Sequence, residues 1–252
     1  MASEYYRVAD LETRVESLVH SVALVVAAFV FGTLVFLSAA SALRAAGFEV
    51  ETMASLPPLL YTALTATQFV GFFAVIGFYV RFHRGGDLFS IGVPSLRNLL
   101  WIAGGFVGLF VVAAVLSAVF QYVGVDTAVN QVTRQVEQHP VLAFYLIPVT
   151  FLFVAPAEEL LYRGLIQGLF RRAYGSVPAV LLASLLFGAP HYFALLGPGD
   201  TKLPSIVLIT VLGLVLGALY ELTENLAVPI VVHACWNSFS FLSQYVEATA
   251  AL

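Results

Sequence analysis

Residues 151–170 of the chain are FLFVAPAEELLYRGLIQGLF, a stretch that places Glu158, Glu159 and Arg163 inside an otherwise apolar run. A helix that crosses a bilayer needs about 20 mostly apolar residues, and an ionisable side chain near its middle costs at least ~2.5 kcal/mol on insertion scales. Ionisable groups kept at such a cost are functional candidates by default. The stretch therefore predicts a membrane-spanning helix with a polar site inside it.

The composition of the whole chain agrees with this interpretation. Hydrophobic residues make up 60% of the sequence, charged residues 10%, and the mean hydropathy is +0.94. A soluble domain is roughly 45–50% apolar and about 25% charged. The sequence predicts an all-α, polytopic transmembrane helical bundle of about seven spans, at residues 18–40, 59–80, 99–123, 141–170, 177–193, 203–220 and 228–245.

Basic residues in the short loops predict the orientation, because cytoplasmic loops carry an excess of Lys and Arg. One side of the predicted bundle collects Arg7, Arg14, Arg81, Arg84, Arg97, Arg171 and Arg172, and the other collects only Arg44, Arg134 and Lys202. This asymmetry places the N-terminus in the cytoplasm of a multi-pass protein of the cell membrane. Seven spans would then place the C-terminal tail outside.

Helical spacing divides the three charged residues of the fourth predicted span into an i,i+4 pair and a single glutamate. Glu159 and Arg163 stand at i,i+4 in the order that favours an intrahelical ion pair. Glu158 lies about 100° around the helix from Glu159, outside that pair. A lone carboxyl group in a membrane needs a partner from another span. We therefore expect Glu158 to meet a polar side chain from a neighbouring helix.

Candidate partners follow in the fifth and seventh runs. His191 lies near the end of one, and His233 and Asn237 stand at i,i+4 on one face of the other. Counted from the loop after Arg172, Glu158 and His191 lie about 21 and 22 Å along their helices, so both reach a similar depth. A carboxylate and a histidine can activate a water, and a histidine and an amide can stabilise an oxyanion. This set predicts amide hydrolysis in a cavity open to the cytoplasm.

These residues resemble the three signatures of the CAAX prenyl endopeptidase and bacteriocin-processing family, known as CPBP or Abi proteases. The signatures EExxxR, FxxxH and HxxxN match Glu158-Glu159…Arg163, Phe187…His191 and His233…Asn237, in this order. The resemblance runs from residue 155 to about residue 237. It implies one membrane domain, in which residues 141–245 form a CPBP-like catalytic helical core and residues 1–140 contribute three spans that the resemblance does not cover.

The resemblance also implies a role for each matching position. Glu158 and His191 would activate the water, and His233 and Asn237 would form the oxyanion hole. Glu159 and Arg163 would support the site by holding their helix in place. The implied activity is a glutamate-type intramembrane endopeptidase acting on a membrane-associated peptide or protein, a prenylated CAAX-type substrate among them.

The same residues and the net charge bear on metal binding, nucleic-acid binding and other functions. No cofactor is expected, and zinc is the alternative, because two histidines and a carboxylate are a known zinc set; an HExxH string is absent from the sequence. The net charge of −4 with few Lys and Arg excludes a nucleic-acid partner. The expected partners are the substrate and the lipid bilayer. A non-proteolytic scaffold or immunity protein and a proton-coupled transporter stay open as alternative functions.

Overall fold

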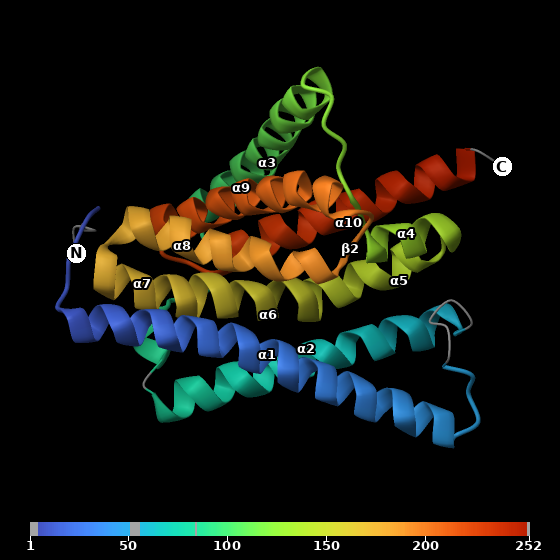
Figure 1. Ribbon diagram of the computed structural model, residues 1–252, viewed down its shortest axis with the longest axis horizontal. Coiled ribbons are helices and arrows are strands. Elements are labelled where there is room, and N and C mark those ends of the chain that lie inside the picture. Colours follow the sequence, from blue (N-terminus) through green and yellow to red (C-terminus); the bar gives the residue numbers. More distant parts are fainter. Residues whose placement is uncertain (1–4, 51–55, 84, 251–252) are drawn as a thin grey trace.

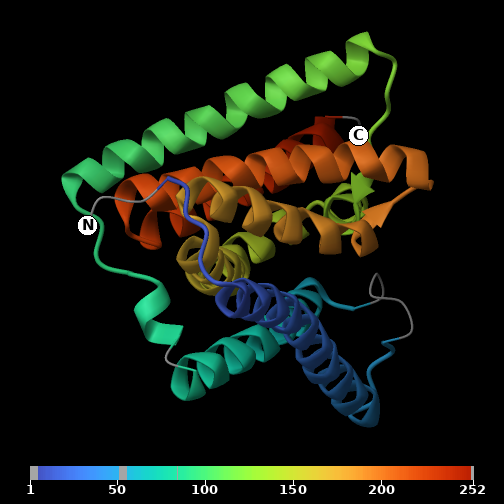
Figure 2. The ribbon, with the colours of Figure 1, turned by 60° about the vertical axis from the view of Figure 1, so that its left-hand side comes forward.

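Six helical segments of the computed structural model, which describes residues 5–50, 56–83 and 85–250, are long and apolar enough to cross a membrane. They are α1 (Leu11–Ala45), α2 (Pro58–Phe82), α3 (Leu96–Tyr122), the segment Leu142–Tyr174, α8 (Ser176–Gly188) with the 3₁₀ turn η5 (Ala189–Phe193), and α9 (Gly199–Thr223). In Figure 2, the α1–α2 hairpin lies on one side of the bundle, α3 lies obliquely on the opposite side, and the other helices lie between them. By the length and composition of these helices, the chain is a multi-pass membrane protein.

The seventh predicted run also forms a helix, α10 (Ala227–Ala250), but it is not among the six candidate spans in the described residues. Its polar side chains, His233 and Asn237 among them, lower its hydropathy. Helix α10 packs against α9, α3 and α5 (Figure 1), so neighbouring helices surround much of its polar face. Six of the seven expected spans are therefore candidate membrane spans, and the seventh is a helix that is more polar than those six. The sidedness of the termini stays a prediction, and Arg84, which was counted for it, lies outside the described residues.

The α1–α2 hairpin crosses where two glycines meet. A Cβ atom added to Gly71 would lie 2.6 Å from the Cα of Gly32, so only glycine permits this approach of the two backbones. Helix α1 begins after Asp10, whose carboxylate accepts a hydrogen bond of 2.7 Å from the backbone N–H of Thr13. This hydrogen bond holds the pKa of Asp10 below its usual value.

An extended N-terminal segment, residues 5–9, connects α1 to the turn between α7 and α8. We call this segment the N-terminal strap. Its three backbone hydrogen bonds are Arg7 N–H to Tyr174 O (2.9 Å), Ala9 N–H to Ala173 O (3.0 Å) and Val177 N–H to Tyr5 O (3.1 Å). The turn itself needs Gly175, whose φ is +85°. The strap thus satisfies backbone groups at the end of α7 and the start of α8 that no helix bond can satisfy.

The fourth span is one continuous helical segment with two π-helical stretches. Its parts are α5 (Leu142–Val149), the π-helix η3 (Thr150–Val154), α6 (Ala155–Glu159), the π-helix η4 (Leu160–Ile166) and α7 (Gln167–Tyr174). Pro148 and Pro156 flank η3, and each withholds an N–H group from the preceding turn. Stretches with i→i+5 bonds are rare and often occur at functional sites. A π-helix rises less per residue than an α-helix. The depth of about 21 Å predicted for Glu158 assumed an α-helix throughout and is therefore too large.

The predicted outer loop at residues 124–140 contains two short elements that the all-α prediction did not include. Strand β1 (Val129–Asn130) pairs antiparallel with β2 (Leu195–Leu196), and helix α4 (Gln131–Gln138) follows β1 directly. On the other side of the bundle, the short 3₁₀ helix η2 (Gly85–Leu88) contacts η4. The β1–β2 pair fixes the chain just after η5, which carries His191, against the loop before α4.

Candidate active site

The ion pair predicted from spacing forms in the middle of the fourth span. Arg163 Nη1 lies 3.0 Å from Glu159 Oε1, and both side chains are 0% exposed. Arg163 Nη2 also donates a hydrogen bond of 3.0 Å to the carbonyl oxygen of Gly213 in α9. The pair therefore holds its own helix and also joins it to α9, in a place where breaking it would leave a buried charge uncompensated.

His233 lies between the two glutamates. Its Nδ1 is 2.8 Å from Glu159 Oε1, and its Nε2 is 3.8 Å from Glu158 Oε2. Because a carboxylate only accepts, Nδ1 is assigned as the donor to Glu159. The Glu158 side chain is 15% exposed, while that of Glu159 is fully buried. Of the two carboxylates, Glu158 is therefore the one that an incoming molecule can reach.

The ring of Phe187 in α8 packs against four side chains of the candidate site. Its centroid lies 5.2 Å from that of Tyr162, 4.9 Å from that of His191 and 5.9 Å from that of His233. The guanidinium carbon of Arg163 lies over the same ring at 4.3 Å, in a cation–π arrangement. Sequence reasoning used Phe187 only as a motif position. The structure makes it the common packing surface of the site, between the fourth span, α8 and α10.

His191 and Asn237 lie at the edge of this group. His191 Nδ1 is 2.8 Å from the carbonyl oxygen of Phe187, which makes Nδ1 the donor and leaves the lone pair on Nε2. In the described part of the chain, no hydrogen bond or ion pair joins His191 to Glu158, and Asn237 makes no hydrogen bond. Asn237 lies one turn beyond His233 and is partly exposed. The structure thus brings Glu158 to His233 directly, and His191 only through Phe187.

A second row of contacts extends from Arg163 along α7. Gln167 donates hydrogen bonds of 3.1 Å to Gly217 O and 2.8 Å to Glu221 Oε1. The pairs Arg163–Gly213 and Gln167–Gly217 repeat every four residues on both helices. A Cβ atom at Gly217 would lie 2.8 Å from Gln167 Oε1, so the GxxxG spacing of α9 permits the contact. The GxxxG spacing of these glycines is visible in the sequence, but no sequence pattern indicates their partners Gln167 and Glu221.

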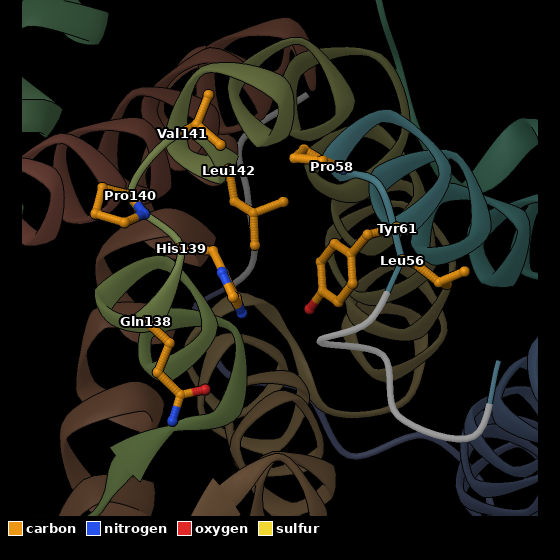
Figure 3. Close-up of a pocket in the computed structure, with 8 residues that line it drawn as sticks. All are labelled: Leu56, Pro58, Tyr61, Gln138, His139, Pro140, Val141 and Leu142. Atoms are coloured by element: carbon orange, nitrogen blue, oxygen red, sulfur yellow. The ribbon is translucent and has the colours of Figure 1, made fainter. Parts of the chain in front are cut away.

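A cavity of about 280 Å³ lies away from these residues, between α2 and the α4–α5 connection. Figure 3 shows Tyr61 and His139 facing it from opposite sides. The residues that line it are Leu56, Pro58, Tyr61, Gln138, His139, Pro140, Val141 and Leu142. None of them is a predicted site residue, so this cavity is separate from the group around His233.

Comparison with protein-family models places part of the chain in a known family. The model described as type II CAAX prenyl endopeptidase Rce1-like matches residues 140–239. The match includes every residue of the three sequence motifs. Searches of curated proteins and of solved structures gave no match to this chain.

Proposed function

Residues 140–239 of this chain form a domain of the Rce1-like type II CAAX prenyl endopeptidase family, and from this premise we propose that the protein is an intramembrane endopeptidase. Its substrate is a membrane-associated peptide or protein, with a prenylated CAAX-type C-terminus as the leading candidate. The observation that carries the proposal is the placement of Glu158, the more accessible of two neighbouring carboxylates, against His233. A carboxylate beside an imidazole inside a membrane bundle suits proton transfer to and from a bound water.

In the proposed reaction, Glu158 accepts one proton of a water, His191 Nε2 accepts a hydrogen bond that orients the same water, and the water oxygen attacks the scissile carbonyl carbon. The C–O bond forms, and the carbonyl oxygen becomes an oxyanion. His233 Nε2–H and the amide of Asn237 donate hydrogen bonds to that oxygen. The C–N bond then breaks as the proton held by Glu158 passes to the leaving nitrogen. The products are a carboxylic acid and an amine, which become a carboxylate and an ammonium group once the acid proton passes to the amine, and no side chain is bonded to the substrate.

The proposed scheme requires His233 to donate hydrogen bonds from both ring nitrogens. Because Nδ1 donates to Glu159, a donor at Nε2 requires the doubly protonated ring. The positive charges of Arg163 and of this imidazolium balance the negative charges of Glu158 and Glu159. We propose that Glu159 orients His233 and Arg163 orients Glu159, so that both act as positioning residues.

The function is tested by comparing cleaved protein termini in membranes that contain the wild-type chain or its Glu158→Ala variant. Termini that appear only with the wild-type chain, in proteins with a C-terminal prenylation motif, are expected. The Glu16→Ala variant serves as a control, because it removes a carboxylate from the exposed part of α1. Identical termini in all three membranes would favour the scaffold alternative.

We expect the activity to survive removal of zinc. The polar groups proposed to react come from three separate helices, and among the described residues no three His, Cys, Asp or Glu side chains gather as a metal-binding group. The measurement is peptide cleavage by purified protein after treatment with a membrane-permeable zinc chelator, with zinc content determined in parallel. Activity that is lost on chelation and restored by zinc would instead make His191 and His233 metal ligands.

We further propose that the N-terminus and the active-site cavity face the cytoplasm of the cell membrane, as the distribution of arginines predicts. Single cysteines at Arg172 and Asp200, in a Cys235→Ala background, test this with impermeant thiol reagents. Arg172→Cys is expected to react from the cytoplasmic side and Asp200→Cys from outside. The opposite pattern of labelling would invert the orientation, and labelling of both from one side would contradict a membrane crossing between them.

A further inference from the structure

Tyr162, one turn after Glu158 in the fourth span, has a buried ring and a hydroxyl group without a partner. The residue is 2% exposed, and in the described part of the chain its hydroxyl makes no hydrogen bond. The fully buried polar atoms that lack a partner include Glu159 Oε2 and Arg163 Nε but not the hydroxyl oxygen of Tyr162. The small exposed part of Tyr162 therefore includes this oxygen, and water can reach it.

Helix geometry directs the Tyr162 hydroxyl toward Glu158. Tyr162 stands at i+4 from Glu158, and a long helical side chain leans back over the residue about one turn earlier. The charged groups close enough to act on the hydroxyl are Glu158 and Arg163. Of these, Arg163 is already bonded to Glu159, whereas the Glu158 side chain is 15% exposed. Because no direct hydrogen bond joins Tyr162 to Glu158, a water between them can satisfy both groups.

Phe187 holds the ring of Tyr162 in this position. The two rings meet edge to face, with centroids 5.2 Å apart and planes at 85°. The same Phe187 ring packs against His191 at 4.9 Å and against His233 at 5.9 Å. Tyr162 thus belongs to the packed group that carries the reactive side chains. Its hydroxyl is a hydrogen-bond donor held at the site and used by no contact within the protein.

We propose that the Tyr162 hydroxyl binds the attacking water and is a further catalytic group of the site. This inference rests on the proposed endopeptidase function. In the scheme above, the two O–H groups of the water point to Glu158 and His191, and one lone pair attacks the carbonyl carbon. The O–H group of Tyr162 donates a hydrogen bond to the other lone pair. This bond strengthens as Glu158 takes a proton, because the water oxygen becomes more negative. Tyr162 keeps its own proton throughout.

The test is cleavage of a farnesylated CAAX-type tetrapeptide by the purified full-length chain and by its Tyr162→Phe variant. This substitution removes one oxygen and keeps the ring against Phe187. We expect kcat to fall about 10-fold or more, the size expected for a lost hydrogen bond to a group that becomes charged. KM should stay within about twofold, and the midpoint of thermal unfolding should not change, since the hydroxyl has no protein partner. An unchanged kcat, or a loss of kcat together with thermal stability, would overturn the proposal.

Tyr220→Phe is the matched control. Tyr220 is also 2% exposed, but its hydroxyl accepts a hydrogen bond of 3.1 Å from the backbone N–H of Ser90. Removing this hydroxyl leaves the N–H group unpaired, so thermal stability should fall while kcat stays the same. The two variants separate a hydroxyl that serves the reaction from one that serves the fold. An equal fall of kcat in both variants would contradict the role of Tyr162.

Infrared spectroscopy of the substrate-free chain tests the water site without cleavage. The C–O stretching band of the Tyr162 phenol is identified by its absence from Tyr162→Phe. The band is expected to shift in Glu158→Ala, which removes the acceptor on the other side of the water, and to stay unchanged in Glu16→Ala. A band that does not respond to Glu158→Ala would overturn the proposal. A shifted band in a chain that cleaves no peptide would support the water site and contradict the endopeptidase.

Discussion

Glu158→Ala is expected to lower kcat/KM for a cleaved peptide by at least about 10³-fold, because it removes the group that takes the proton from water. Folding should change little. The Glu158 side chain is partly exposed, and its one polar contact in the described residues is the 3.8 Å approach to His233. His191→Ala should cause a similar loss with little change in folding, since among the described residues His191 hydrogen-bonds only to the carbonyl of Phe187, four residues earlier. The measurements are steady-state cleavage and thermal unfolding in the same detergent.

The Glu158→Gln variant separates the effect of losing the proton acceptor from the effect of changing the size of the side chain. It keeps the volume of the side chain but cannot accept the proton, so it should be as inactive as Glu158→Ala. A Glu158→Ala variant that still cleaves at a tenth of the wild-type rate would show that another group activates the water. Loss of activity together with a large loss of thermal stability would assign Glu158 a structural role instead.

Glu159→Ala is expected to lower the free energy of unfolding by about 3–5 kcal/mol, the usual cost of leaving one charge of a buried pair without its partner. The carboxylate of Glu159 contacts both Arg163 Nη1 and His233 Nδ1, so its removal leaves two polar groups unpaired. Thermal unfolding in detergent, with extraction yield recorded beside it, measures the effect. Residual activity should also fall, because His233 loses the group that orients it.

The double variant Glu159→Leu with Arg163→Met tests the cause of this loss. Replacing both members of a buried pair by apolar groups of similar size is often neutral or stabilising. We therefore expect the double variant to recover most of the stability that Glu159→Ala loses, while cleavage stays low because His233 is no longer held. A double variant as unstable as Glu159→Ala would show that packing, and not the uncompensated charge, decides the effect.

The sequence predicted the helices and the ion pair between Glu159 and Arg163, but it predicted the contacts between helices less well. The i,i+4 spacing sufficed for Glu159 and Arg163, because both lie on one helix. The bond from Glu159 to His233 joins residues 74 positions apart, and it depends on how α10 is rotated against α6. Counting residues along helices gives depth but no rotation. Glu159 was therefore paired with Arg163 alone, while its second partner was missed.

Two features of the fold differ from the prediction for local physical reasons. The sequence predicted α10 as one of the membrane-spanning runs, yet polar residues such as His233 and Asn237 make it less apolar than the six candidate spans. The π-helical stretches have no signature in the hydrophobic pattern, although Pro148 and Pro156 mark where regular bonding must fail. Both differences occur in the helices that carry Glu158 and His233. In these helices, regular α-helical bonding or a uniformly apolar surface is interrupted where polar side chains lie inside the bundle.

The N-terminal strap has a consequence for the biogenesis of the protein. Its hydrogen bonds join residues 5–9 to the turn at Gly175, so both must be on the same face of the bilayer once the chain has folded. An even number of crossings must separate them, and α1, α2, α3 and the segment Leu142–Tyr174 supply four. Residues 5–9 therefore reach their hydrogen-bond partners only after more than 160 further residues have been synthesised. The N-terminal hairpin cannot reach its final contacts until the helix pair carrying Glu158 and His191 has been inserted, which makes assembly of this enzyme candidate a late and cooperative step.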